Sequence, residues 1–348
     1  MSDLIIRREG QAGRITLNRP DALNALTYQM CLDIDAALRA WATEDAVSLV
    51  VIDGTGNRAF CAGGDLTRMY ETGRSCDFSY GRQFWRDEYR LNALIAGYPK
   101  PFVALMHGFT MGGGVGVSCH GSHRIVCETS QIAMPEVGVG IVPDVGGSLL
   151  LARAPGRVGE FLGATGTRMS ATDAIYCGFA DSYVPQSKWS ALLSELQADG
   201  TTAPIDAYAV PHPGALLKDH QPLIDACFAQ PSLHEIAEAL EAEGGEFADK
   251  ALKALSRASP LAAACGIELV RRARSHNSIA EALATEFRFT YRCMGQGDFL
   301  EGIRAAIIDK DKLPRWAHRA FSEVTRDEVT AMLDTLGPAE LWSNEDQP

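Results

Sequence analysis

The chain has 348 residues, of which 46% are hydrophobic and 22% are charged, and it carries a formal net charge of −12 at pH 7. This length fits one large domain with an appendage, and the apolar share is ample for a sizeable core. The acidity argues against a nucleic-acid partner, because a surface that binds phosphates needs an excess of Lys and Arg. A small anionic ligand needs only a local basic patch, so it stays compatible with this charge.

The first ten residues, MSDLIIRREG, contain no apolar run of signal-peptide length and no Arg- and Ser-rich leader. No segment has about 18 uninterrupted apolar residues, the length expected of a membrane span. We therefore expect a soluble protein of the cytoplasm without a membrane partner. The nine cysteines are scattered singly with no CxxC pair, which predicts reduced thiols in the core rather than disulfides or a zinc site.

The first part of the chain alternates β-rich runs with helical stretches. Strands are expected at residues 4–7, 13–17, 48–52, 102–106 and 124–126, with the first two forming a hairpin. Helical periodicity covers residues 27–42, and a further helix is expected to begin within glycines 112–114. Strand, glycine turn, helix and strand, repeated, is an α/β pattern with parallel crossovers.

The composition changes between residues 198 and 214, where Ala, Gly, Thr and Pro accumulate. Beyond this segment the chain has helical spacing and few strand formers. Helices are predicted at residues 233–240, 247–258, 260–273, 278–293 and 298–308. We therefore expect an α/β domain over residues 1–204, followed by an α-helical region over residues 205–348.

Two glycine-rich turns follow apolar runs that are typical of buried strands. Residues 61–65 read CAGGD and residues 111–114 read MGGG. Glycine lets the backbone come close to a ligand. Backbone N–H groups in such turns can stabilise the negative charge that develops on a carbonyl oxygen, with one donor contributing roughly 3–4 kcal/mol. Gly64 and Gly113 are the candidate donors, and tight turns without a ligand are the structural alternative.

The segment MPEVGVGIVPDVGG (residues 134–147) places two acids, Glu136 and Asp144, within apolar sequence. If both face one pocket, loss of hydration and mutual repulsion push their pKa values apart. One carboxyl would then stay ionised as a base or nucleophile while the other holds a proton. Hydrogen bonding of each acid to turn backbone is the alternative.

Three other patterns do not fit the sites that they resemble. MGGGVG lacks the third glycine of a dinucleotide-binding fingerprint, because Val117 stands in its place. In GVSCHG, Gly121 comes one residue too late for a serine-hydrolase elbow around Ser118. His120 and His123 have no third ligand at a predictable offset, so no metal site is expected.

CAGGD, MGGGVG and MPEVGVGIVPDVGG, in this order, resemble the crotonase (enoyl-CoA hydratase/isomerase) superfamily, and most closely its 3-hydroxyisobutyryl-CoA hydrolase branch. FWRDEYRLN (residues 84–92) and EGIRAAIIDKDKLPRW (residues 301–316) also resemble that branch. The resemblance implies a ββα-repeat spiral core followed by an α-helical C-terminal region. It also implies an acyl-CoA substrate, whose coenzyme A part belongs to the substrate, with no metal and no separate cofactor.

The resemblance also assigns roles residue by residue. It places the oxyanion-hole donors at Gly64 and Gly113 and the two catalytic acids at Glu136 and Asp144. Further substrate contacts fall on Glu88, Ala62 and Leu66, the last two through backbone that meets the adenine.

Hydratases of this superfamily typically place a glutamate three residues after the oxyanion glycine, and here Gly116 stands at this position. The two-glutamate addition of water to an enoyl double bond is therefore hard to arrange. We expect hydrolysis of a short 3-hydroxyacyl-CoA, with 3-hydroxyisobutyryl-CoA, as in valine degradation, as the leading substrate. Enoyl-CoA hydration, isomerisation and CoA binding without chemistry are the alternatives. Superfamily members often form trimers, and a helical tail can cover the same surface, so a homo-oligomer stays open.

Overall fold

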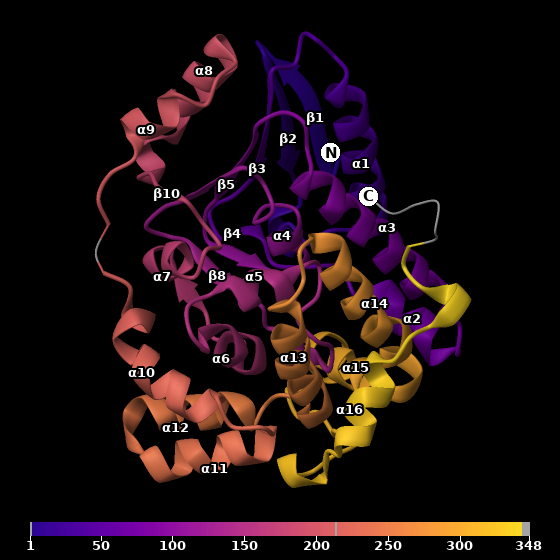
Figure 1. Cartoon of the computed structure of the whole chain (residues 1–348). Helices are drawn as coiled ribbons and strands as arrows, with labels where there is room; N and C mark the ends of the chain where they lie inside the picture. Colours follow the sequence, from indigo (N-terminus) through magenta and orange to yellow (C-terminus); the bar gives the residue numbers. More distant parts are fainter. Residues whose placement is uncertain (1, 213, 343–348) are drawn as a thin grey trace. The chain divides into compact units, whose positions relative to one another are not determined.

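The computed structural model describes residues 2–212 and 214–342, and its elements are labelled along the chain in Figure 1. The chain divides into two compact units, each assembled from separate segments. Unit 1 comprises the described residues of segments 1–65, 90–133 and 168–216, and unit 2 those of segments 66–89, 134–167 and 217–348.

Unit 1 is built on a six-stranded sheet with the order β1-β2-β3-β5-β7-β10. Its strands are β1 (Leu4–Glu9), β2 (Ala12–Leu17), β3 (Leu49–Gly54), β5 (Phe102–Met106), β7 (His123–Val126) and β10 (Ser182–Tyr183). β1 and β2 form the predicted antiparallel hairpin, and the later pairings are parallel. Parallel strands need a crossover connection, and α1 (Tyr28–Ala42) supplies the one between β2 and β3.

A second sheet of unit 1 has four short strands in the order β4-β6-β8-β9. They are β4 (Ala59–Cys61), β6 (Phe109–Met111), β8 (Gln131–Ala133) and β9 (Met169–Ser170). β4, β6 and β8 run parallel to one another, whereas β9 is antiparallel to β8. Since β4 and β6 are parallel neighbours, the glycine-rich turns that follow them both lie at the carboxyl ends of the strands, on the same side of this sheet.

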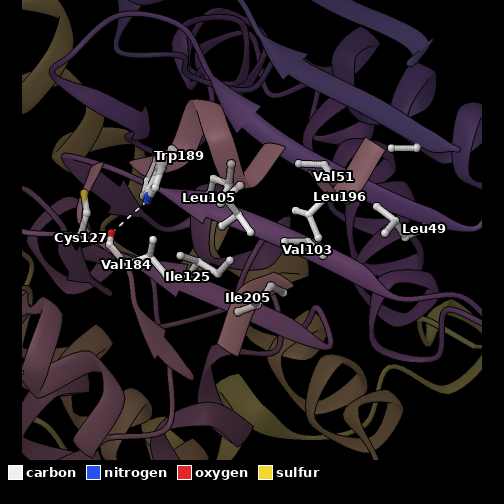
Figure 2. Packing of buried hydrophobic residues seen from close by; sticks show 12 residues of the cluster. Leu49, Val51, Val103, Leu105, Ile125, Cys127, Val184, Trp189, Leu196 and Ile205 are labelled. Atoms are coloured by element: carbon white, nitrogen blue, oxygen red, sulfur yellow. Dashed lines mark hydrogen bonds between the residues drawn. The ribbon is translucent and has the colours of Figure 1, made fainter. Parts of the chain in front are cut away.

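The core of unit 1 lies between the six-stranded sheet and two helices, α8 (Trp189–Asp199) and α9 (Pro204–Tyr208). Alternate positions of β3 and β5 supply side chains to one face, as the period of a strand requires. Figure 2 shows this packing of Leu49, Val51, Val103 and Leu105 around the α8 side chains. The indole Nε1 of Trp189 donates a 3.0 Å hydrogen bond to a backbone carbonyl, which satisfies the only polar atom of that side chain.

Helices make up most of unit 2. Its helices are α2 (Thr67–Arg74), the first part of α3 (Ser79–Ala96), η2 (Glu136–Val139), α5 (Gly147–Arg153), α6 (Val158–Thr165), α10 (Leu216–Phe228), α11 (Leu233–Glu243), α12 (Gly245–Leu255), α13 (Pro260–Ala273), α14 (Ile279–Gln296), α15 (Phe299–Ile303) and α16 (Arg326–Leu333). Helix α13 packs against α5 and α6, and α14 also contacts α5. The C-terminal helices therefore contact the segment that follows Glu136 and Asp144.

The remaining helices are short. Unit 1 also contains α4 (Gly113–Gly116), α7 (Ala171–Tyr176), η1 (Pro20–Ala22) and η3 (Gln186–Lys188). Unit 2 also contains η4 (Arg304–Ile308), η5 (Phe321–Glu323) and η6 (Gly337–Ala339).

The predicted fold class, α/β with an α-helical C-terminal region, is confirmed. One predicted helix differs, because residues 298–308 form α15 followed by the π-helical segment η4. Arg304, at the start of that segment, pairs with Glu301 at 2.8 Å and with Asp309 at 2.6 Å, so ion pairs bracket the wider turn. The division between residues 204 and 205 stays a prediction.

Two expectations from composition can be compared with the described residues. No helix within residues 2–212 and 214–342 is long and apolar enough to cross a membrane. The cysteines are free thiols, and all are buried except Cys76, which is exposed and therefore not the core thiol that the sequence predicts.

Leu105 lies within the core of unit 1 and is 0% exposed. Replacing Leu105 by Ala is expected to lower the free energy of unfolding by about 2–5 kcal/mol, because the substitution removes buried methyl groups and leaves a cavity. Urea denaturation followed by circular dichroism measures this change. Leu313→Ala, at a position 71% exposed, is the matched control and should change stability little. Equal effects of the two substitutions would contradict the assignment of Leu105 to the core.

Candidate active site

The glycine turn after β4 is held by backbone bonds to Leu26. The Leu26 amide donates to the Gly63 carbonyl at 2.9 Å, and the Asp65 amide donates to the Leu26 carbonyl at 2.8 Å. These bonds form a parallel bridge between Leu26 and Gly64. In such a bridge the N–H of the middle residue points away from its partner, so the Gly64 amide is not used to hold the turn. Gly63 has φ +117°, a conformation that favours glycine.

The second turn presents the amide of Gly113. Gly112 has φ +51°, and Gly113 is the first residue of α4, so its N–H has no carbonyl partner within the helix. A Cβ on Gly114 would lie 2.3 Å from the Cys61 carbonyl oxygen, which shows that α4 packs directly on the end of β4. Unit 1 thus brings the two candidate oxyanion donors to adjacent turns.

Ser118 is hydrogen-bonded to the helix that precedes it. The Ser118 hydroxyl donates to the Gly114 carbonyl at 2.6 Å, so this serine caps the short helix rather than standing on a nucleophile elbow. Across the part of the chain that the structure describes, no group of three His, Cys, Asp or Glu side chains is placed to hold a metal ion.

Unit 2 brings the three predicted acids together. Glu88 lies on α3, Glu136 begins η2, and Asp144 lies in the turn before α5, with exposed fractions of 4%, 7% and 6%. Burial raises the pKa of Glu136 well above its ordinary value, and the charge of Asp144 raises it further. Burial and the charge of Asp144 also raise the pKa of Glu88. Because the charge of Asp144 acts on both glutamates, the three acids share one buried environment.

Asp144 is the most readily ionised of the three. Burial raises the pKa of Asp144 to about 6, and a hydrogen bond from Tyr89 opposes this rise. The Tyr89 hydroxyl donates to Asp144 Oδ2 at 2.7 Å. Glu136 Oε2, in contrast, has no hydrogen-bond partner among the described residues. The Tyr89 hydroxyl on Asp144 and the unpartnered Oε2 of Glu136 therefore help to separate the two acidities.

Sequence reasoning missed Tyr89. This side chain is fully buried, and the charges of Asp144 and Glu286 add to the effect of burial in raising its pKa. In the sequence it is one aromatic residue on an amphipathic helix. Its partner Asp144 lies 55 residues away, so no local pattern marks the pair.

Sequence reasoning also missed Glu286 on α14, which is 0% exposed. Its carboxylate accepts hydrogen bonds from the Gly146 amide at 2.8 Å and from the Ser148 amide at 3.0 Å. The Ser148 hydroxyl donates to the same carboxylate. Burial raises the pKa of Glu286 to about 7, against the lowering effect of these donors. The turn after Asp144 is therefore anchored by an acid 140 residues further along the chain.

The last two predicted contacts are backbone positions. Ala62 is half-buried in unit 1, and its amide donates to the Leu23 carbonyl at 3.0 Å. Leu66 is half-buried and precedes α2 in unit 2. Their contact with the adenine of CoA stays a prediction, as do the catalytic roles of the glycines and acids.

With two glycine amides at neighbouring strand ends and a cluster of buried carboxyls, the chain has the parts that chemistry at an activated carbonyl requires. The chain belongs to the enoyl-CoA hydratase/isomerase family, whose model matches residues 12–333. The predicted family is thus confirmed.

Individual relatives match almost the whole chain. It is 36% identical to the mitochondrial 3-hydroxyisobutyryl-CoA hydrolase of Gallus gallus, over 98% of this chain and 91% of that protein. It is similar to the crystal structure of an enoyl-CoA hydratase from Rhodobacter sphaeroides, with 53% identity, a TM-score of 0.95, and coverage of 98% and 100%. A carnitinyl-CoA dehydratase from Mycobacterium thermoresistibile has 40% identity, a TM-score of 0.94, and coverage of 98% and 99%.

Replacing Tyr89 by Phe removes the hydroxyl that donates to Asp144. We expect the pKa of Asp144 to rise above its value of about 6, because the ionised carboxylate loses a hydrogen bond that favours it. A titration of ¹³C-labelled aspartate carboxyls by NMR measures the shift.

The matched control is Tyr98→Phe, which removes a hydroxyl bonded instead to the Leu38 carbonyl at 2.7 Å. This variant should leave the Asp144 titration where it is in the parent protein. An unchanged or lower pKa of Asp144 in the Tyr89→Phe protein would show that the hydroxyl does not stabilise the carboxylate.

Proposed function

We propose that this chain hydrolyses short 3-hydroxyacyl-CoA thioesters, with 3-hydroxyisobutyryl-CoA as the leading substrate, to the free acid and CoA. The observation that carries the proposal is the buried set of Glu88, Glu136 and Asp144 within a member of an acyl-CoA family. The full-length similarity to a 3-hydroxyisobutyryl-CoA hydrolase supports it.

The amides of Gly64 and Gly113 act on the thioester carbonyl. As the carbonyl carbon becomes tetrahedral, negative charge develops on its oxygen, and two N–H groups that are not needed by the fold stabilise that charge. Their glycines sit in turns fixed by backbone bonds, so the donors need little reorganisation during the reaction.

Glu136 carries the step at the acyl carbon. Its carboxylate either attacks the thioester carbonyl or takes a proton from a water molecule that attacks, and in both cases the carbon–sulfur bond breaks and CoA leaves as a thiol. If Glu136 attacks, water then cleaves the resulting anhydride. Both routes require an ionised Glu136. Asp144 is the more readily ionised acid of the pair, and the two buried carboxyls repel each other's charge, so Glu136 becomes ionised only as Asp144 takes up the shared proton.

Asp144 and Glu88 orient the rest of the acyl group. Asp144, held by Tyr89, accepts a hydrogen bond from the substrate hydroxyl or from water and takes part in moving the proton. Burial and the charge of Asp144 raise the pKa of Glu88, which favours its protonated form, and a protonated carboxyl can donate a hydrogen bond to the acyl group. Hydrolysis needs only water besides the substrate, so no separate cofactor is proposed.

Hydration is the second candidate, because the named structural relatives are a hydratase and a dehydratase. The family resemblance places a hydratase's additional glutamate at the position of Gly116. Here that position is a buried glycine of α4 and carries no carboxyl. Isomerisation requires only one base and CoA binding requires none, so the missing carboxyl at position 116 does not exclude either of them. The same substrate panel tests both alternatives together with hydration. Consumption of crotonyl-CoA without thiol release would favour hydration over hydrolysis.

Replacing Glu136 by Gln tests the catalytic assignment. We expect thiol release from 3-hydroxyisobutyryl-CoA and 3-hydroxypropionyl-CoA to fall by about 100- to 10,000-fold, the usual contribution of a positioned base. CoA should still bind, as isothermal titration calorimetry can show, because the amide preserves the size of the side chain. Crotonyl-CoA and acetyl-CoA complete the substrate panel as esters without a 3-hydroxyl. Near-normal turnover by the variant would remove Glu136 from the mechanism.

Replacing Gly114 by Ala tests the oxyanion turn. The added Cβ would lie 2.3 Å from the Cys61 carbonyl oxygen, so α4 must move and carry the Gly113 amide with it. A misplacement approaching 1 Å should reduce kcat by about 100-fold. Gly97→Ala is the control, because its Cβ would meet only an ordinary contact at 3.6 Å. If thiol release by both variants equals that of the parent, the turn does not hold the reacting oxygen.

A further inference from the structure

We propose that Glu286 is the positioning residue that holds Asp144 in place, and that the helical C-terminal region thereby forms part of the catalytic apparatus. The inference rests on the proposed function for its catalytic meaning. Its structural content, an anchored turn, can be tested without any turnover.

The turn that carries Asp144 has an unfavourable backbone. Val145 has φ +53° and Gly146 has φ +78°, so two successive residues adopt the left-handed region. This conformation is unfavourable for a β-branched residue such as valine, and it persists only where the surroundings impose it. Contacts from outside the turn must therefore stabilise the backbone of residues 144–147.

Glu286 supplies contacts on the far side of this turn. Oε2 accepts from the Gly146 amide and Oε1 accepts from the amide and the hydroxyl of Ser148. These amides lie at the start of α5, where backbone N–H groups have no carbonyl partner inside the helix. A buried carboxylate from another helix thus satisfies them.

The anchor is transmitted to Asp144 through a short path. The Gly147 amide donates to the Asp144 carbonyl at 2.7 Å, so the backbone that Glu286 fixes also fixes the backbone of Asp144. The side chain of Asp144 is held separately by Tyr89. Asp144 is therefore held in two ways: Tyr89 on α3 donates a hydrogen bond to its carboxylate, and Glu286 on α14 accepts hydrogen bonds from the turn that follows it.

Glutamine cannot replace glutamate here, although the two side chains have the same shape. Each oxygen of Glu286 faces at least one N–H donor. The amide of glutamine offers one oxygen and one NH₂, so one of the two sites would place a donor against a donor. A buried donor without an acceptor is unfavourable, and we expect the turn to shift.

The experiment compares four variants of the full chain by thiol release from 3-hydroxyisobutyryl-CoA. Glu286→Gln should lose about 10- to 100-fold in kcat, while KM and the affinity for CoA stay within about threefold, because a misplaced group affects the reacting step. Ser148→Ala, which removes one donor and keeps the backbone bonds, should lose several-fold in kcat, about threefold or more.

Two variants on the same helix act as controls. Glu281→Gln makes the identical substitution at an exposed position, where the carboxylate accepts a hydrogen bond from the Asn277 amide at 3.1 Å. Leu283→Ala removes a fully buried side chain from α14 and should lower the melting temperature. Both should retain the parental kcat below their melting transitions. A loss of kcat in Leu283→Ala equal to that in Glu286→Gln would reduce Glu286 to a general stabilising role and overturn the proposal.

NMR tests the anchor independently of turnover. In Glu286→Gln, the amide signals of Gly146 and Ser148 and the carboxyl signal of Asp144 should shift, and in Glu281→Gln they should not. Unchanged signals would overturn the proposal even in an active enzyme. If the parent protein releases no thiol, the hydrolase assignment fails, and the NMR comparison still decides whether Glu286 anchors the turn.

If Glu286→Gln does not fold, Ser148→Ala is used as the test variant instead. Parental kcat and unchanged NMR signals in Ser148→Ala would then overturn the proposal.

Discussion

Burial of acids without cations is the constraint on which unit 2 depends. Glu88, Glu136, Asp144 and Glu286 are each less than a tenth exposed, and within residues 2–212 and 214–342 none of them forms an ion pair. A buried carboxylate without a cation must find hydrogen-bond donors or keep its proton. Tyr89 supplies a donor to one acid, and the start of α5 supplies three to another. In both acids these donors oppose the rise in pKa that burial causes.

The C-terminal helices have a role in this arrangement beyond covering the unit. Besides the Glu286 contact from α14, the Ser259 amide at the start of α13 donates to the Val137 carbonyl of η2 at 2.9 Å. On α15, a Cβ at Gly302 would lie 2.2 Å from the Val139 carbonyl oxygen, so this helix also packs closely on η2. The turns that carry Glu136 and Asp144 are thus both supported from the same region of sequence.

Local patterns were sufficient to predict the parts of the site that the backbone itself builds. The glycine turns, the first hairpin and the two acids in apolar sequence each depend on neighbours within a few residues, where alternation and turn chemistry are informative. Tyr89 and Glu286 could not be predicted, because their partners lie 55 and 140 residues away and only the packed helices bring them together. The π-helical end of α15 was missed for a different reason, since the ion-pair partners of Arg304 are close in the chain but hydrophobic periodicity does not reveal a wider turn.

The location of the carboxyls bears on which reaction of the family this chain performs. In unit 1, the helix that begins at Gly113 continues through Gly116, so this element contains the proposed oxyanion amide and no acid. All three of the proposed catalytic or substrate-contacting acids belong to unit 2. This distribution of acids favours attack at a carbonyl carbon, assisted by Glu136 and Asp144, over addition of water across a double bond. In the hydratases that the sequence resembles, that addition uses two glutamates, one after the glycine-rich motif and one in the later proline-containing motif. With the proposed site residues, the oxyanion turns would serve either reaction and the acids would distinguish hydrolysis from hydration.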